Sequence, residues 1–351
     1  SPGRLDVERK GHMFSIRKIV CVVLVFSACA SQPSVAEVRP AAKAAASAKN
    51  PRIMRYVPGS KAAAVAWGKQ LRSKLNVLMK IDDLVSAKTP VPLNPKTIST
   101  EKRGKYVLHI VEINSTKKRR MKIAVTLPVN PKGPCPAVVA IGGHSSTYLS
   151  CLDSEGGYYR FAHVLSEKGY VTVSRRVSQH KPFRRERTLM GERLWDLMRC
   201  VDYLESLKEV APKRIGCGGL SLGGEMSMWL GGMDTRIKAT VSSGFLTTMD
   251  QLERNHCMCW KFPGLRDLVD FADIYALTAP RALLCQNGLK ERPGWFYVPI
   301  ARKALAEIAP AYADFKKPGY LKLVAHKGGH EIDLPSLVAF FDKHLGGATG
   351  Q

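Results

Sequence analysis

Ser221 stands in the segment Gly219-Leu220-Ser221-Leu222-Gly223, which has the pattern G-x-S-x-G. An apolar run at residues 215–220 precedes the serine, and a helix is expected from Gly223 onward. Between a strand and a helix, this pattern is typical of a tight turn that exposes the serine hydroxyl beside the positive end of the helix dipole. The chemistry predicted for Ser221 is therefore nucleophilic attack, and a purely structural turn is the alternative.

A serine hydroxyl needs a base at neutral pH, and that base is usually a histidine oriented by a carboxylate. His330 follows the last expected strand in the segment Lys327-Gly328-Gly329-His330-Glu331. The two glycines let this loop bring the histidine across the strand ends. His326 is the nearest rival, but it falls at the end of the strand itself. We therefore predict that His330 is the general base.

The carboxylate that orients His330 has two candidates. Glu291 lies in the loop after the strand expected at residues 282–286, where chain order places the acid between the serine and the histidine. Asp250 follows the preceding strand and is the alternative acid. We favour Glu291, for which a surface ion pair with a neighbouring cation is the other interpretation.

Attack by the serine creates a negatively charged oxygen, which two backbone amides are expected to bind. The first is the amide of Leu222, directly after the nucleophile. The second comes from the glycine-rich loop Gly142-Gly143-His144-Ser145, and we assign it to the amide of His144. The side chain of His144 would then line the cleft or cap the following helix.

The elements that must position these residues alternate along the chain. A helix is expected over residues 61–81 and a hairpin over residues 106–113 and 121–127. Further strands are expected at residues 137–141, 171–174, 215–220, 239–243, 282–286 and 321–325, and helices at residues 161–168, 192–207, 265–277, 300–308, 334–344 and from 223. This alternation predicts a mainly parallel sheet with helices on both faces.

The first 30 residues have a different character. Residues 1–12 precede Met13 and are expected to be an upstream extension. Residues 13–30 contain two cations, an apolar run too short to span a bilayer, and then small residues, which is the layout of a secretory signal peptide. Cleavage is expected after Ala30, whereas a lipobox-like ending would leave Cys29 as a lipidated N-terminus. Both alternatives predict export, to the periplasm or beyond the cell.

The catalytic domain is expected over residues 52–347. Residues 31–51, between the signal peptide and this domain, are rich in Ala and Lys and lack large apolar side chains, which is typical of a linker. No internal repeat is visible.

The chain is strongly basic. Its formal charge is +25, and +22 remains when residues 1–30, with five basic and two acidic side chains, are removed. Such a field attracts anionic partners. Export favours an acidic polysaccharide or an anionic envelope surface over nucleic acid, and a solvated basic surface without a partner is the alternative.

The nine cysteines contain no C-x-x-C pair, which excludes a disulfide scaffold and a zinc ribbon. Cys217 and Cys285 lie in apolar, strand-like runs and are expected to be buried thiols. His256, Cys257 and Cys259 are close enough to suggest a metal site, but a fourth ligand at suitable spacing is missing. We therefore expect no metal and no organic cofactor.

The segment from Met190 to Ala239 resembles bacterial α/β hydrolases of the acetyl xylan esterase and dienelactone hydrolase-like group. The shared features are a helix of the form G-x-R-x-x-D-x-x-R, the G-x-S-x-G turn, an x-D-x-R-I-K-A run and an A-P-R tripeptide, matched here by Gly191, Arg193, Asp196, Arg199, Ser221, Asp234, Arg236 and residues 279–281. The resemblance covers most of residues 100–346. It implies an α/β-hydrolase fold and hydrolysis of a short acyl ester, acetyl in the first place, on a small ester or an acylated polysaccharide.

Departures from the group leave other functions open. Glu291 stands where relatives usually have Asp, and Leu222 replaces the Gln of cephalosporin-deacetylating relatives. Prolyl-oligopeptidase-like peptidases share the serine turn but carry a large extra domain, for which 351 residues leave no room. A degenerate, non-catalytic hydrolase that binds anionic polysaccharide is the third interpretation, and the unusual segment Arg292-Pro293-Gly294-Trp295 is its main support.

Overall fold

The computed structural model describes residues 51–254 and 256–346, and the strands of these residues form one sheet. In chain order the strands are β1 (Lys96–Arg103), β2 (Tyr106–Thr116), β3 (Arg119–Pro128), β4 (Cys135–Ile141), β5 (Val171–Arg175), β6 (Val210–Leu220), β7 (Ile237–Ser243), β8 (Ala282–Gly288) and β9 (Leu321–His326). They lie in the order β1-β2-β3-β5-β4-β6-β7-β8-β9. From β5 to β9 in this order every pair is parallel, whereas β1, β2, β3 and β5 pair antiparallel. The predicted mainly parallel sheet is confirmed.

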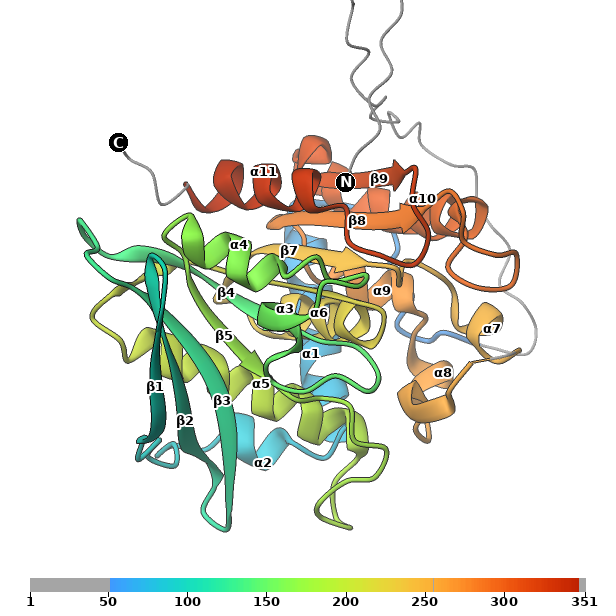
Figure 1. The fold of residues 1–351 in the computed structure, drawn as a ribbon. Helices are drawn as coiled ribbons and strands as arrows, with labels where there is room; N and C mark the ends of the chain where they lie inside the picture. Colours follow the sequence, from blue (N-terminus) through green and yellow to red (C-terminus); the bar gives the residue numbers. More distant parts are fainter. Residues whose placement is uncertain (1–50, 255, 347–351) are drawn as a thin grey trace, which may run out of the picture. The chain divides into compact units, whose positions relative to one another are not determined.

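Helices cover both faces of this sheet (Figure 1). They are α1 (Lys61–Leu78), α2 (Asp82–Val85), α3 (Ser150–Asp153), α4 (Phe161–Glu167), α5 (Leu189–Glu205), α6 (Leu222–Met233), α7 (Met249–Leu252), α8 (Leu265–Leu268), α9 (Phe271–Ala276), α10 (Val298–Asp314) and α11 (Leu334–Leu345), with single 3-10 turns at Met258–Trp260 and Pro318–Tyr320. α5, α6 and α10 pack on one face, and α4 and α11 pack on the other.

The fully apolar strand β4 shows why both faces need cover. Side chains alternate along a strand. Val139 and Ile141 therefore join the hydrophobic core beneath α5 and α6, whereas Val138 and Ala140 join the core beneath α4 and α11. Because every residue of β4 is buried, the strand has no hydrophilic face.

Helix α1 forms where its sequence provides a cap and an apolar stripe. The hydroxyl of Ser60 accepts a hydrogen bond from the amide of Ala63, which satisfies one of the free donors of the first turn. Leu71 and Leu75, one turn apart, are both buried. The predicted helix over residues 61–81 is present and ends three residues earlier.

Two features differ from the predicted elements. Strand β1 is almost wholly exposed and lacks the apolar alternation that marks a half-buried strand, so its sequence carries no clear strand signal. The single helix expected at residues 265–277 is instead α8 followed by α9. Asp270 separates the two because it adopts an extended conformation and forms a capping box with Asp273 at the start of α9.

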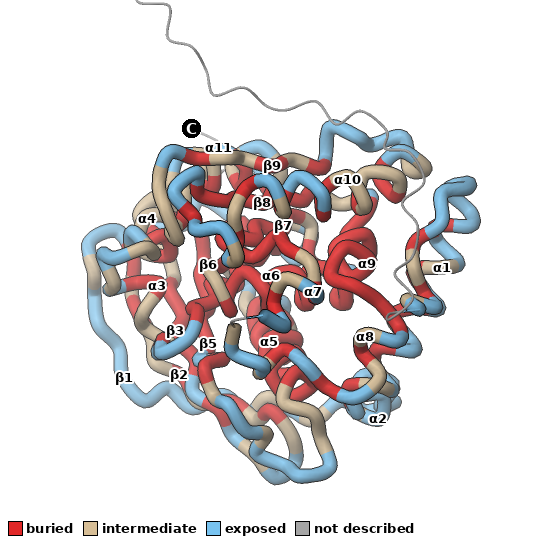
Figure 2. The backbone as a smooth tube through the Cα atoms, turned by 90° about the vertical axis from the view of Figure 1, so that its right-hand side faces the viewer, coloured by how far each residue is buried: buried red, intermediate tan, exposed pale blue. Residues whose placement is uncertain are grey.

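The loops that carry the predicted site residues emerge at one edge of the sheet, because parallel strands all end on the same side. Figure 2 faces the side to which the β8 and β9 arrows of Figure 1 point. It shows the central strands β5, β6, β7 and β8 mostly buried, whereas β1 and many of the connecting loops are exposed. Residues in the loops after β4, β6, β8 and β9 are therefore placed to meet at this edge.

The predicted extension at residues 1–12, the signal peptide at 13–30 and all of the predicted linker except Pro51 lie outside the described residues. Within the part of the chain that the structure describes, no helix combines the length and apolarity needed to cross a membrane.

Candidate active site

Ser221 lies at the sharp turn between β6 and α6. Its backbone angles are φ +61° and ψ −122°, which is strained for a residue with a side chain and costs on the order of 1–3 kcal/mol. Close packing against the end of β4 accompanies this strain. A Cβ atom at Gly219 would lie 2.2 Å from the carbonyl oxygen of Ile141, and one at Gly223 would lie 2.1 Å from the same oxygen. Only glycine fits at either position, so both glycines of the motif have a packing reason.

His330 and Glu291 meet at the same edge from neighbouring loops. Glu291 follows β8 and His330 follows β9, and His330 Nδ1 lies 2.7 Å from Glu291 Oε1. The Glu291 side chain is only 3% exposed, whereas that of His330 is 30% exposed. A carboxylate at Nδ1 favours the tautomer that leaves Nε2 free to accept a proton. This is the geometry that a general base and its orienting acid require.

Aromatic packing also holds the His330 imidazole. The Phe296 ring stacks on it with centroids 5.3 Å apart and an angle of 19° between planes. On another side the imidazole abuts the backbone of Gly244, where an added Cβ would lie 2.8 Å from its Cε1 atom. The ring therefore has little freedom to rotate away from Glu291.

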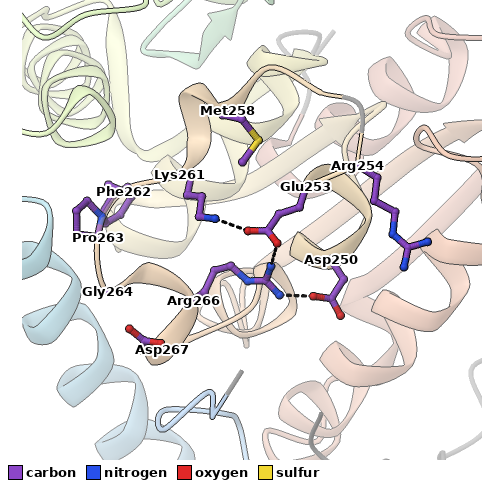
Figure 3. A pocket seen from close by; sticks show the side chains of 10 residues that line it. All are labelled: Asp250, Glu253, Arg254, Met258, Lys261, Phe262, Pro263, Gly264, Arg266 and Asp267. Atoms are coloured by element: carbon purple, nitrogen blue, oxygen red, sulfur yellow. Dashed lines mark hydrogen bonds and ion pairs between the residues drawn. The ribbon is translucent and has the colours of Figure 1, made fainter. Parts of the chain in front are cut away.

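The rival acid, Asp250, lies in a different cluster. It is an exposed residue of α7 and forms an ion pair with Arg266, which also pairs with Glu253 (Figure 3). The rival base, His326, ends β9 and its Nδ1 accepts a hydrogen bond of 3.3 Å from the amide of Gly328. Of the two acids predicted from the sequence, the structure pairs Glu291 with His330.

The loop predicted to supply the second oxyanion amide lies directly against Ser221. A Cβ atom at Gly143 would lie 3.3 Å from Ser221 Cβ. The hydroxyl of Tyr158 accepts a hydrogen bond of 2.6 Å from the Gly143 amide, so that amide is engaged and the next amide is that of His144. Leu222, the first residue of α6, is buried and lines the same cavity as His144.

A cavity of about 220 Å³ opens beside Ser221. Its walls include four aromatic residues from three different segments, namely Phe245, Trp260, Trp295 and Phe296. The volume is below the range of about 300–1,000 Å³ that drug-sized ligands occupy. Trp295 belongs to the segment that seemed unusual in the sequence, and its place in the wall gives that segment a function in shaping the pocket.

Glu225, which the sequence argument missed, also lines this cavity. It lies in the first turn of α6, four residues after Ser221, and is fully buried. Burial raises the pKa of its carboxyl to about 7, although the Arg193 guanidinium opposes this shift. A charged residue within the otherwise apolar stretch of α6 was the available signal, because buried acids cluster at functional sites.

Glu225→Gln is expected to remove a pH dependence of stability. Between the ordinary carboxyl pKa of 4.5 and the folded pKa of about 7, the unfolded chain ionises Glu225 while the folded chain keeps it protonated. The free energy of unfolding therefore falls as pH rises through this range, by up to about 3 kcal/mol, and is unaffected by Glu225 below it. Urea denaturation of both proteins at pH 5 and pH 8 measures the effect. Equal losses of stability in the wild type and the variant would contradict it.

The aspartate of the helix pattern G-x-R-x-x-D-x-x-R has a structural role. Asp196 of α5 is buried and binds the guanidinium groups of Arg119 and Arg175, with 2.9 Å between Arg175 Nη2 and Asp196 Oδ2. Although burial opposes ionisation, these two cations hold the pKa of Asp196 below its usual range. These ion pairs connect α5 to β3 and β5, and β5 pairs directly with β4.

The basic segment at residues 175–187 is partly neutralised from within. Arg175 pairs with Asp196, Arg184 pairs with Glu186 and Arg187 pairs with Asp83. The carboxylate of Glu192 accepts hydrogen bonds from the amides of Phe183 and Arg184 in the same segment. Three of the six cations of this segment therefore have acidic partners.

The structure confirms the two predicted buried thiols and separates His256 from the two cysteines with which the sequence grouped it. Cys217 and Cys285 are buried thiols in β6 and β8, as predicted. His256, which was grouped with Cys257 and Cys259, instead places its Nε2 atom 3.3 Å from the carbonyl oxygen of Gly294. The histidines whose ring nitrogens lie within 4.8 Å of the two cysteine sulfur atoms are His144 and His180, which come from other loops.

Comparison with known proteins gives relatives at low identity. No protein-family model matches the chain. The Bacillus subtilis protein YtaP, to which hydrolase activity has been attributed, is 26% identical over an alignment of 226 positions that covers 57% of this chain and 75% of that protein. Among solved structures, a Bacteroides fragilis protein to which acetyl xylan esterase activity has been attributed has a TM-score of 0.65 at 21% identity, with 81% of this chain and 83% of that chain covered. A glucuronoyl esterase from Solibacter usitatus has a TM-score of 0.63 at 18% identity, with 83% and 97% covered. Sheet order and these neighbours together establish the α/β-hydrolase fold.

Proposed function

We propose that this chain, which has the α/β-hydrolase fold, is an exported serine esterase that removes short acyl groups, acetyl in the first place, from carbohydrate. The observation that carries the proposal is the 2.7 Å contact between His330 and Glu291 at the sheet edge that also carries Ser221 in its strained turn. The resemblance of the fold to proteins named as carbohydrate esterases supports the substrate class.

In the proposed mechanism, Ser221 Oγ attacks the carbonyl carbon of the ester while His330 Nε2 takes its proton. The carbonyl oxygen becomes negatively charged and receives hydrogen bonds from the amides of Leu222 and His144. His330 then protonates the leaving alcohol, and the acyl group stays on Ser221. Attack by water, again with His330 as base, releases the acid and restores the hydroxyl. Glu291 stabilises the imidazolium that forms in each half.

The small aromatic cavity supports a short acyl group. A volume of about 220 Å³ accommodates an acetyl group, while the sugar would extend toward the exposed loops. An exposed Trp295 at this rim offers the kind of flat apolar face on which a sugar ring packs.

A preference for an anionic polymer is the finer part of the proposal. The net charge outside residues 1–30 is +22, and such a field attracts uronate or sulfate groups. Since three cations of residues 175–187 are already paired, the overall field rather than that segment alone would supply the attraction.

We expect kcat/KM at low salt to be higher on acetylated glucuronoxylan than on a neutral acetylated oligosaccharide, and lowest on long-chain esters. Raising the salt toward physiological strength shortens the Debye length to about 8 Å and should remove the preference for the anionic substrate. The measurement is acetate release from each substrate over a salt series. An equal salt response for both would refute the anionic preference, whereas preference for long-chain esters would refute the esterase specificity itself.

A further inference from the structure

Four side chains with metal-binding atoms gather at the rim of the candidate active site. They are His144, His180, Cys257 and Cys259, and one ligand atom from each lies within 4.8 Å of the others. His144 Nε2 is 3.4 Å from Cys259 Sγ, and the rings of His144 and His180 stack with centroids 5.5 Å apart. The group is not evident in the sequence because its members are far apart along the chain. The two histidines follow β4 and β5, and the cysteines follow α7.

The donor set is one that zinc prefers. Two imidazole nitrogens and two thiolate sulfurs form the Cys₂His₂ set of structural zinc sites, with bond lengths that place tetrahedral ligand atoms roughly 3.3–3.8 Å apart. The four atoms here are at most 4.8 Å apart, so their separations exceed that spacing by no more than about 1.0–1.5 Å. Three of the four residues are exposed and Cys259 is partly exposed, so rotation of the side chains closes this difference without moving a packed core.

We propose that His144, His180, Cys257 and Cys259 bind one Zn²⁺ ion. The two thiolates balance its charge. A neighbouring donor supports one of them, because Arg193 Nη1 lies 3.5 Å from Cys259 Sγ and donates a hydrogen bond to it. Hydrogen bonds to ligand atoms orient them and strengthen metal sites. The earlier expectation of no metal depended on a missing fourth ligand and on His256, and the structure replaces His256 with two histidines from other loops.

The bound zinc is structural, because all four positions around it are filled by protein. It joins the loops after β4, β5 and α7 into one unit. His144 is also the residue whose amide is assigned to the oxyanion, and Cys257 and Cys259 line the cavity beside Ser221. The zinc ion thus holds in place the loop that contains His144 and the part of the pocket wall that contains Cys257 and Cys259. This consequence rests on the proposed function, whereas zinc binding itself does not.

The test measures zinc directly on the purified chain. Protein is stripped with a chelator, kept reduced, loaded with Zn²⁺, desalted and analysed by mass spectrometry of the metal. We expect about one zinc ion per chain, in the wild type and equally in Ser221→Ala. His180→Ala and Cys257→Ser, both at exposed positions, should weaken zinc binding by more than about 100-fold in competition with a chromophoric chelator.

His256→Ala is the matched control, since it removes a histidine next to Cys257 that lies outside the group. It should retain zinc. Zinc should also raise the thermal midpoint of the wild type by several degrees and leave that of His180→Ala unchanged.

Zinc content that is negligible in the wild type, or equal in His180→Ala and the wild type, overturns the proposal. A disulfide between Cys257 and Cys259 in the reduced and loaded protein, seen as a mass loss of about 2 Da, overturns it as well. Failure of the esterase proposal would look different from failure of the zinc proposal. In that case the wild type and Ser221→Ala would both bind zinc, and neither protein would hydrolyse esters.

Discussion

Ser221→Ala should lower kcat on p-nitrophenyl acetate by several orders of magnitude, toward the uncatalysed rate. The variant keeps the oxyanion amides and the His330–Glu291 pair, but it lacks the only atom that can form the acyl-enzyme in the proposed mechanism. Its thermal midpoint should stay close to that of the wild type, because the Ser221 side chain makes no capping hydrogen bond to α6. Initial rates at saturating substrate and a thermal melt measure both quantities.

The control for this experiment is Ser206→Ala, which removes an exposed serine at the end of α5 and should leave kcat unchanged. Residual activity above a few percent in Ser221→Ala, with purity checked, would mean that another residue is the nucleophile. Absence of ester hydrolysis in the wild type would instead favour the non-catalytic interpretation, in which the site binds but does not react.

Much of the fold follows from sequence pattern, because most of its strands are buried on both faces. Runs such as β4 and β6 are continuously apolar where they cross the core, and α5 carries a repeated apolar face. Strand β1 escaped prediction for the opposite reason. It lies at an edge, is almost wholly exposed, and is held by pairing with β2 rather than by side-chain burial.

The candidate triad was accessible because its order along the chain follows the order of strands. A histidine after β9 and an acid after β8 must lie side by side once those two strands pair in parallel. The choice between Glu291 and Asp250 depends on loop conformation, which the pattern of apolar residues does not encode. Only the structure shows one carboxylate at 2.7 Å from the imidazole and the other in an ion pair with Arg266.

The proposed zinc ligands show where sequence inspection reaches its limit. Proximity along the chain selected His256 beside Cys257 and Cys259, yet the turn there directs His256 toward Gly294. The histidines that complete the group come from loops more than seventy residues upstream. Such a meeting depends on the strand order, here β5-β4-β6-β7, which is visible only in the folded chain.

Glu291→Gln should reduce kcat on the order of 10⁴-fold with little change in KM. An amide of the same size still fills the site beside His330, but it does not stabilise the imidazolium that forms as Ser221 loses its proton. It also permits the wrong imidazole tautomer, because an amide nitrogen can donate to Nδ1 where the carboxylate only accepts. The interaction that is lost exists mainly in the transition state, so substrate binding is spared. Steady-state kinetics on p-nitrophenyl acetate separates the two parameters.

Asp250→Asn is the matched variant, since it makes the same carboxylate-to-amide change at the rival acid. It removes an exposed ion pair with Arg266, which is worth at most about 1 kcal/mol of stability, and kcat should stay within about twofold of the wild type because Asp250 does not contact His330. A large fall in kcat for Asp250→Asn with a small one for Glu291→Gln would reverse the assignment. Such a result would require α7 to move toward His330 when substrate binds, breaking the Asp250–Arg266 pair that the structure shows.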